Sequence, residues 1–324
     1  MDHDAEPVVR LCGGLQVGTG ESALGPRDLG GSKARYVLLA LLLDGGTAVS
    51  KNRLIDYLWA DTPPAGALGT LEAYVCLLRK KLAPALPGPS PVVTVPGGYR
   101  WDVDRAPVDV VEFARRATEA RADALAAGYA VPAYERAISL VPQVCLPDEV
   151  DLPWLQEHIR VHHTLVLNVY TEGARAALDA DNLQLAERWA RRALERDGLL
   201  ESSWLVLLET LERSGQQAAA VREYATCRRT FSVELGCDPG PALRNVFSRL
   251  LAATSADDGD LPDLVEAVVR LHEARFDGPK GGASLREDYR LLEELLRITD
   301  ARAGHPALAR PVTTRPGVRS MSMT

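Results

Sequence analysis

The sequence has few of the features that mark secreted, membrane-spanning or disulfide-bonded proteins. Its five cysteines are an odd number without a C-x-x-C pair, which argues against a disulfide framework and a zinc ribbon. The longest apolar run, residues 36–43, is far shorter than the roughly 18 to 20 residues of a membrane span. The acidic start, residues 1–4, does not resemble a signal peptide. We therefore expect a cytoplasmic protein without a membrane partner.

Positive charge is also scarce. The chain has a net charge of −7, and only five of its 37 basic residues are lysine. Residues 1–105 carry 11 basic and 11 acidic side chains, whereas the remainder is acidic. This balance excludes a general polyanion binder. A nucleic-acid surface would have to be local, and we expect it in the neutral N-terminal region.

Residues 1–105 alternate between strand and helix signals. Short extended stretches within residues 8–17 are broken by glycines. Three helices are predicted over 33–43, 51–59 and 65–82, with Ser32 and Ser50 as the N-caps of the first two. A β-hairpin is predicted from 92 to 103 around the turn Pro96-Gly97-Gly98. This order is typical of an α+β winged helix-turn-helix domain.

From residue 109 onward the strand signal gives way to helical patterns. They cover 109–127, 131–141, 152–179, 183–196, 202–214, 217–235 and 241–253. Two of the helical hairpins match at a spacing of 34, the tetratricopeptide period. The matched positions are Tyr170 with Trp204, Ala177 with Leu211, Asp181 with Gly215, Ala186 with Ala220, Ala190 with Tyr224, and Ala193 with Cys227. Residues 106–254 are therefore predicted to form an all-α, tetratricopeptide-like solenoid.

The C-terminal residues differ again. Two amphipathic stretches, 261–276 and 285–301, are joined by a glycine-rich linker. We expect residues 255–302 to form a helical hairpin that caps the solenoid, because apolar stripes on both stretches must be buried. Residues 303–324 have no period and are predicted to be a disordered tail.

The third predicted helix, 65–82, carries the most specific local signal. Leu71, Val75, Leu78 and Leu82 form one apolar stripe. The opposite face holds Gly69, Glu72, Ala73, Cys76, Arg79 and Lys80, and in a helix-turn-helix protein this face reads the major groove. The cations at its end contact phosphates, or only complement the negative end of the helix dipole.

Two further segments strengthen the DNA-binding hypothesis. Ser50 and Lys51 place N–H groups and a cation at a helix start, which is a ready phosphate site. Tyr99 and Arg100 follow a Gly-Gly turn on the hairpin. The complete set of predicted DNA-binding residues is Lys33, Arg35, Ser50, Lys51, Arg53, Gly69, Thr70, Glu72, Ala73, Cys76, Arg79, Lys80, Tyr99 and Arg100.

Enzymatic and metal-binding alternatives have weaker support. His158 and His162 are four residues apart on a predicted helix, a spacing that can bind zinc, but no third ligand stands nearby. Residues 278–284 are glycine-rich with a lysine but lack the spacing of a phosphate-binding loop. We predict no catalytic residue, metal or cofactor.

Several ordered motifs together resemble the Streptomyces antibiotic regulatory protein family. In the first region they are Gly31-Ser32-Lys33-Ala34-Arg35, Leu58-Trp59, Thr70-Leu71, Leu78-Arg79-Lys80 and Pro96-Gly97-Gly98-Tyr99-Arg100. In the second, Leu211 to Gly215 and Glu234 to Pro241 resemble the family's bacterial transcriptional activation domain. The resemblance covers residues 8–252.

The resemblance implies an OmpR-type winged helix that binds double-stranded DNA at direct repeats upstream of promoters. It also implies a helical domain that forms a homodimer and contacts RNA polymerase holoenzyme, and an activator of antibiotic or other secondary-metabolite gene clusters. The sequence departs from the family on the recognition helix. Leu68-Gly69 replaces Arg-Asn, Glu72 replaces Gln, and Cys76-Leu77 replaces Ser-Arg. These departures support an alternative, a protein-interaction regulator whose winged helix has lost specific DNA binding.

Overall fold

The computed structural model describes residues 9–125, 130–141 and 152–254. The chain divides into two compact units, Met1–Gly215 and Gln216–Thr324, and each is described by itself. The predicted cap (255–302) and tail (303–324) lie outside the described residues. The domain boundary expected between residues 105 and 106 stays a prediction.

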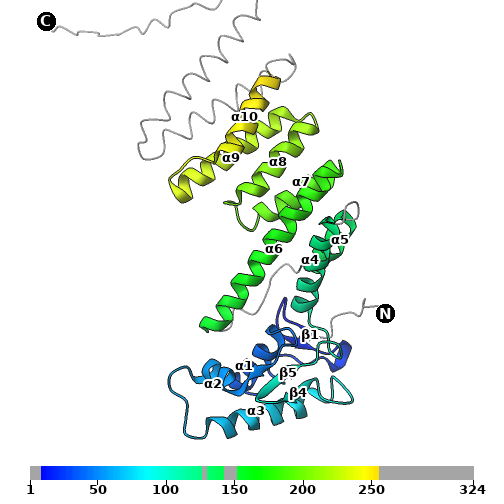
Figure 1. Cartoon of the computed structure of the whole chain (residues 1–324), viewed down its shortest axis with the longest axis vertical. Helices are drawn as coiled ribbons and strands as arrows, with labels where there is room; N and C mark the ends of the chain where they lie inside the picture. Colours follow the sequence, from blue (N-terminus) through cyan, green and yellow to red (C-terminus); the bar gives the residue numbers. More distant parts are fainter. Residues whose placement is uncertain (1–8, 126–129, 142–151, 255–324) are drawn as a thin grey trace, which may run out of the picture. The chain divides into compact units, whose positions relative to one another are not determined.

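The first part of the chain forms the predicted α+β winged helix-turn-helix. Figure 1 shows the strands of this part close to its helices, with α3 next to the β4–β5 hairpin. Its elements in chain order are β1 (Val9–Arg10), β2 (Gln16–Val17), the 3-10 helix η1 (Gly20–Ser22), α1 (Ser32–Leu43), β3 (Val49–Ser50), α2 (Lys51–Trp59), α3 (Ala67–Leu82), β4 (Val92–Val95) and β5 (Gly98–Trp101).

The hairpin, or wing, is tied to the start of α2. Strands β3, β5 and β4 form an antiparallel sheet in that order, with Ser50 opposite Gly98. A Cβ atom on Gly98 would lie 2.1 Å from the carbonyl oxygen of Val49, so a side chain at this position would push the strands apart. The backbone N–H of Lys51 donates to the carbonyl of Gly97 at 2.9 Å. The wing and the first residue of α2 are therefore held together by backbone contacts.

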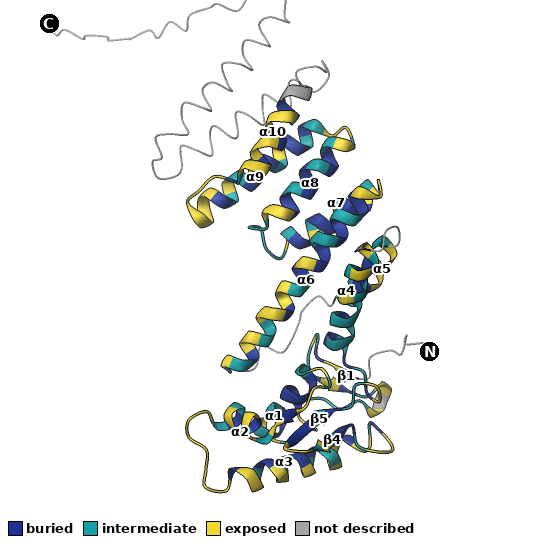
Figure 2. Cartoon of the chain, viewed as in Figure 1, coloured by how far each residue is buried: buried dark blue, intermediate teal, exposed yellow. Residues whose placement is uncertain are grey.

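An apolar core fills this domain, and α1 is buried over most of its length (Figure 2). The predicted apolar stripe of α3 is buried as expected. The Oγ of Ser50 accepts a hydrogen bond from the N–H of Arg53 at 3.2 Å, which confirms the predicted N-cap of α2. The prediction for Ser32 was wrong. Ser32 is the first residue of α1, and Gly31 occupies the N-cap without a side-chain hydrogen bond.

The described elements that follow are helices, close to their predicted bounds. The first unit contains α4 (Asp109–Leu125), α5 (Ala130–Ser139), α6 (Pro153–Asp179), α7 (Leu183–Leu194) and α8 (Glu201–Arg213), and the second contains α9 (Gln217–Leu235) and α10 (Pro241–Thr254). Helix α7 packs against both α6 and α8 (Figure 1). In the three described ranges no helix is both long and apolar enough to cross a membrane.

The repeat at a spacing of 34 has a counterpart in backbone conformation. The matched helical positions are all buried. The matched turn residues Asp181 and Gly215 both adopt a left-handed conformation, with φ angles of 59° and 73°. The left-handed conformation is unfavourable for a residue with a side chain. Arg213 stabilises the turn at Asp181, because it donates to the Asp181 carboxylate at 2.8 Å and to the carbonyl of Leu178 at 2.7 Å. The two turns are thus equivalent in structure as well as in sequence position.

Within the first unit, α6 begins against α2 of the winged helix. The ring of Trp154 stacks on that of Tyr57, with centroids 4.6 Å apart and planes inclined by 18°. The ring of His158 meets Trp154 edge-on at 6.1 Å. We call Tyr57, Trp154 and His158 the aromatic joint. It connects a helix of the predicted DNA-binding surface to the helical region.

Candidate nucleic-acid interface

The exposed face of α3 presents mainly small and apolar side chains. The residues on it recur every three or four positions, as one helical face requires, and they are Gly69, Glu72, Ala73, Cys76 and Lys80. Leu68 beside them is 49% exposed. Thr70 is less available, because it is half-buried and its hydroxyl donates to the carbonyl of Gly66 at 3.0 Å. The predicted reading face is therefore on the surface, with Arg79 only partly exposed.

The carboxylate of Glu72 is paired with Lys51 at the start of α2. The Nζ atom of Lys51 donates to its Oε1 at 2.7 Å, and this hydrogen bond raises the pKa of the lysine. Both side chains keep contact with solvent. A DNA phosphate at the N-terminus of α2 would therefore compete with Glu72 for Lys51. No sequence periodicity points to this pair, because its members belong to different helices.

Arg79 has a structural role that its sequence position did not reveal. Its Nε and Nη2 donate to the carbonyl of Val92 at 3.1 and 2.9 Å, and Nη2 also donates to the hydroxyl of Thr94 at 2.7 Å. These bonds fasten the wing to α3. The assignment of Arg79 as a phosphate contact stays a prediction, and in the described structure its guanidinium is bonded to the hairpin. Lys80 is exposed and remains a candidate for DNA contact.

Three other side chains predicted to contact DNA bond to backbone carbonyls or are buried. The Nζ atom of Lys33 donates to the carbonyl of Leu58 at 2.6 Å. Arg35 donates to the carbonyl of Gly30 at 3.1 Å, and Tyr99 is only 4% exposed. These side chains satisfy backbone carbonyls or fill the core. Their assignment as DNA contacts stays a prediction, and in the described structure these side chains also hold the fold.

Ser50, Arg53 and Arg100 remain at the surface. Ser50 and Arg53 are exposed and Arg100 is partly exposed. The Nε of Arg53 donates to the hydroxyl of Tyr57 at 2.6 Å, and its Nη1 lies 3.7 Å from a carboxylate oxygen of Asp44. Arg53 thereby links the predicted phosphate site to the aromatic joint.

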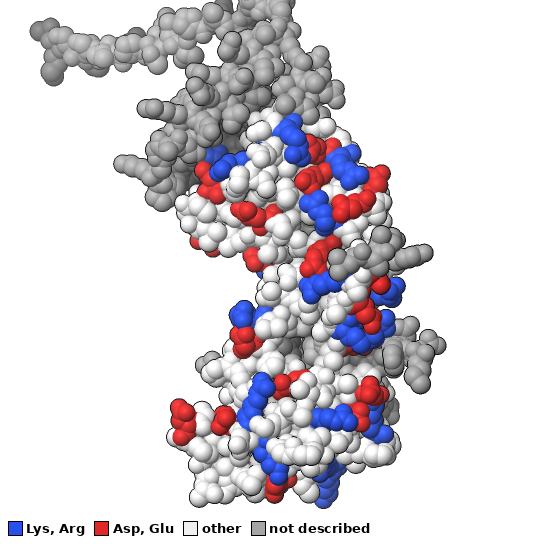
Figure 3. Space-filling model, viewed as in Figure 1, with Lys and Arg blue, Asp and Glu red and all other residues white. Residues whose placement is uncertain are grey.

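Charge is mixed on the face of the molecule that Figure 3 shows. Figure 3 shows Lys and Arg interspersed with Asp and Glu on the face in view, without a broad field of either sign. This agrees with the even balance of residues 1–105. Electrostatic attraction to DNA would therefore come from a few local cations and from helix N-termini.

The two histidines considered as zinc ligands pack against aromatic rings. His162 is buried and meets the ring of Phe113 edge-on at 5.3 Å, while His158 belongs to the aromatic joint. The described ranges contain no group of three or more His, Cys, Asp or Glu side chains that could hold a metal ion. Both rings contribute to packing.

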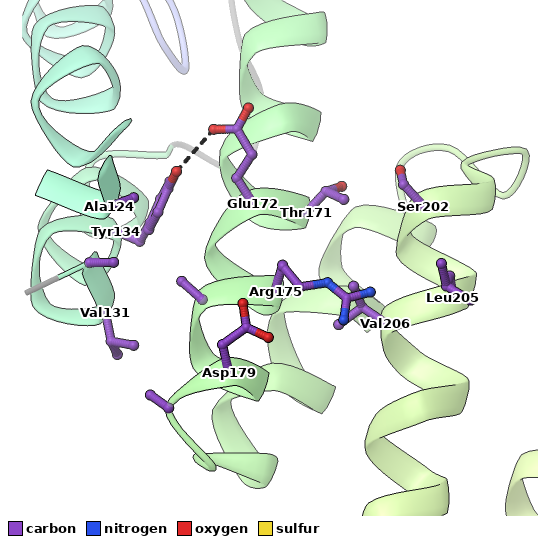
Figure 4. Close-up of a pocket in the computed structure, with 13 residues that line it drawn as sticks. Ala124, Val131, Tyr134, Thr171, Glu172, Arg175, Asp179, Ser202, Leu205 and Val206 are labelled. Carbon is purple, nitrogen blue, oxygen red and sulfur yellow. Dashed lines mark hydrogen bonds between the residues drawn. The ribbon is translucent and has the colours of Figure 1, made fainter. Parts of the chain in front are cut away.

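The first unit also has a pocket of about 650 Å³ between α4, α5, α6 and α8 (Figure 4). The Tyr134 hydroxyl donates to Glu172 at 3.1 Å, and Arg121 pairs with the same carboxylate at 2.8 Å. Arg175 pairs with Glu209 at 2.6 Å. The side chains that line the described pocket include no His or Cys, so they offer no Ser–His or Cys–His pair for nucleophilic catalysis.

Two family models match the chain, in the order that the fold shows. Residues 29–101 match the model described as "Transcriptional regulatory protein, C terminal", and residues 108–251 match "Bacterial transcriptional activator domain". The first match covers α1 to β5 and the second runs from just before α4 into α10. The chain thus combines an OmpR-type DNA-binding domain with a helical activator domain.

Similar proteins are transcriptional regulators. The transcriptional regulatory protein MoaR1 of Mycobacterium tuberculosis is 29% identical over 235 residues, which cover 71% of this chain and 75% of the relative. Regulatory protein DnrI of Streptomyces peucetius is 27% identical over 253 residues, covering 72% and 89%. A solved structure, Mycobacterium tuberculosis EmbR in complex with a low affinity phosphopeptide, is 24% identical with a TM-score of 0.62, covers 83% of this chain and 72% of that chain, and supports the fold alone.

Proposed function

The chain belongs to the Streptomyces antibiotic regulatory protein family, and on that premise we propose that it is a sequence-specific DNA-binding activator of transcription. The observation that carries the proposal is the pairing of the two family domains, in order, on one chain. Because this family consists of transcriptional regulators, we do not propose an enzymatic activity for the chain.

The proposed mechanism is positioning. Phosphates would be held by the N-terminus of α2, with Ser50 and Lys51, and by Arg100 on the wing, while the exposed face of α3 enters the major groove. The backbone clip between Lys51 and Gly97 supports this arrangement, because it keeps the two phosphate contacts together. Lys80 adds a cation at the end of α3.

We further propose that two copies bind direct repeats upstream of promoters, that the helical region holds a second protomer, and that it contacts RNA polymerase holoenzyme. The target genes would belong to an antibiotic or other secondary-metabolite cluster, as the resemblance to the Streptomyces antibiotic regulatory protein family suggests. Such a protein works where the chromosome is, so we expect it in the cytoplasm.

A mobility-shift titration of the full chain against the regions upstream of its neighbouring genes tests this function. We expect specific binding that weakens steeply with salt. When a half-site pair is separated by an extra half helical turn, about 5 bp, the two protomers should lose cooperative binding, since they would face opposite sides of the duplex.

The second candidate is an interaction protein that keeps the winged helix without reading DNA. Leu68, Gly69 and Glu72 on the reading face, and the engagement of Arg79 by the wing, favour it. Equal, weak binding to every duplex in the same titration would support this candidate over the activator.

A further inference from the structure

The reading face of α3 has few groups that can recognise purines. Guanine is usually read by Arg or Lys and adenine by Asn or Gln, in two-hydrogen-bond pairs. Helix α3 contains no Asn or Gln, and its arginine, Arg79, is bonded to Val92 and Thr94 of the wing. Lys80 lies near the end of the helix, beyond the exposed residues Leu68, Gly69, Glu72, Ala73 and Cys76. Purine hydrogen bonding therefore has little support along the first three turns.

The same face is well suited to an apolar partner. Leu68 is 49% exposed, and the methyl of Ala73 and the thiol of Cys76 are exposed on the same helix. The apolar group that base edges display in the major groove is the 5-methyl of thymine, which alanine and similar side chains contact. The Lys51 ammonium beside Glu72 offsets part of the carboxylate charge that would otherwise repel the phosphates.

We propose, resting on the proposed DNA-binding function, that this chain recognises its operator mainly through thymine methyl groups packed against Leu68, Ala73 and Cys76. Glu72 adds a secondary preference for cytosine. Its bond to Lys51 uses Oε1, and the second carboxylate oxygen can accept from a cytosine amino group. The operator half-site is thus read from its pyrimidines.

Replacing thymine by uracil tests this proposal, because uracil lacks only the 5-methyl group. The full chain first selects duplexes from a randomised pool. Each thymine of the selected site is then exchanged for uracil, and the dissociation constant is measured. Loss of one buried methyl should weaken binding about fourfold. Uracil outside the protected half-sites is the control and should leave binding unchanged.

Variants assign the effect to the helix. For each duplex pair we compare the dissociation constant of the uracil-substituted duplex with that of the thymine duplex. Leu68→Ala and Ala73→Gly should each bring this ratio of dissociation constants toward one at a single thymine position. Lys80→Ala should weaken binding to both duplexes equally and leave the ratio of dissociation constants unchanged. Circular dichroism checks that each variant is folded, and Leu68→Ala is the safer test because its side chain is exposed and alanine favours a helix.

The outcomes separate the two proposals. If no duplex is enriched from the pool, the proposed function fails and this inference fails with it. If a duplex is enriched and binds with equal affinity after every thymine is replaced, DNA binding stands and the methyl readout is overturned.

Discussion

At the scale of single residues, partners inside the protein decide which cations DNA can use. Lys33, Arg35 and Arg79 look equivalent to Lys51 and Arg100 in the sequence, yet the first three donate to backbone carbonyls of the domain. Lys51 is shared between Glu72 and any incoming phosphate. Fewer side chains are therefore free of such bonds for the proposed DNA contact than the count of basic residues suggests.

Arg100 on the wing should contribute a phosphate contact. Arg100→Ala should weaken binding to all sequences by a similar factor and flatten the slope of log K against log salt by about 0.9. Titrations at several salt concentrations measure both quantities. Arg188→Ala, which removes an exposed arginine from α7, is the matched control and should change neither. An unchanged slope for Arg100→Ala would place Arg100 away from DNA.

Glu72 should contribute to base preference. Glu72→Gln removes the charge that holds Lys51 and adds an amide donor, so the preferred base at one position per half-site should change from cytosine toward adenine. Binding to duplexes that differ only at that position measures the change. Glu234→Gln removes an exposed carboxylate from α9 and serves as the charge control. A uniform gain of affinity without altered preference would show that Glu72 acts only as a repulsive charge.

At the scale of secondary-structure elements, hydrophobic periodicity and turn residues predicted most helix bounds. The predicted bounds of α2 and α9 match the observed ones. Ser50 caps the start of α2, and the left-handed Gly236 ends α9. The packing of α6 on α2 was not predicted. A single sequence contains no signal that pairs Trp154 with Tyr57.

The aromatic joint should stabilise the first unit. Trp154→Ala removes a half-buried ring stack and should lower the free energy of unfolding by about 2 kcal/mol, measured by denaturant titration. Trp154→Phe keeps a ring and removes an indole N–H that is buried without a hydrogen-bond partner in the described structure, so it should cost little. Val161→Ala, at an exposed position of α6, is the control. Equal effects of Trp154→Ala and Val161→Ala would contradict a role for the joint.

His158 should make that stability depend on pH. Burial lowers the pKa of His158 from its ordinary value of 6.5; Arg53 lowers it further, while Asp44 and Glu157 act in the opposite direction. Because the folded state disfavours the protonated ring, the stabilisation is complete above pH 6.5 and declines as pH falls below it.

Unfolding titrations at pH 7.5 and at pH 5.5 measure this loss. His158→Gln should reduce the difference between the free energies of unfolding at the two pH values. His163→Gln, at an exposed position of the same helix, should retain that difference. A difference that persists in full after His158→Gln would assign the pH dependence to other groups.

At the scale of the whole molecule, the fold was more predictable than the site. The order of elements and the 34-residue repeat follow from local patterns, and the two family matches agree with the order of the domains. The site depends on contacts between elements, such as Lys51 with Glu72 and Arg79 with Val92. Such contacts form only when the chain is folded, which is why the sequence predicted a reading helix but not the internal partners of its side chains.

The backbone clip between the wing and α2 also has a kinetic consequence. Because Gly98 packs directly on Val49 and the N–H of Lys51 holds Gly97, we expect the proposed DNA-binding surface to be assembled before the protein meets DNA. Association in stopped-flow fluorescence should then show one phase whose rate rises linearly with DNA concentration, and a plateau in that rate would reveal a rearrangement step. Gly98→Ala should introduce that plateau by separating the strands. For the intact chain, the time spent on the operator would then depend on the dissociation rate constant alone, without a rearrangement step.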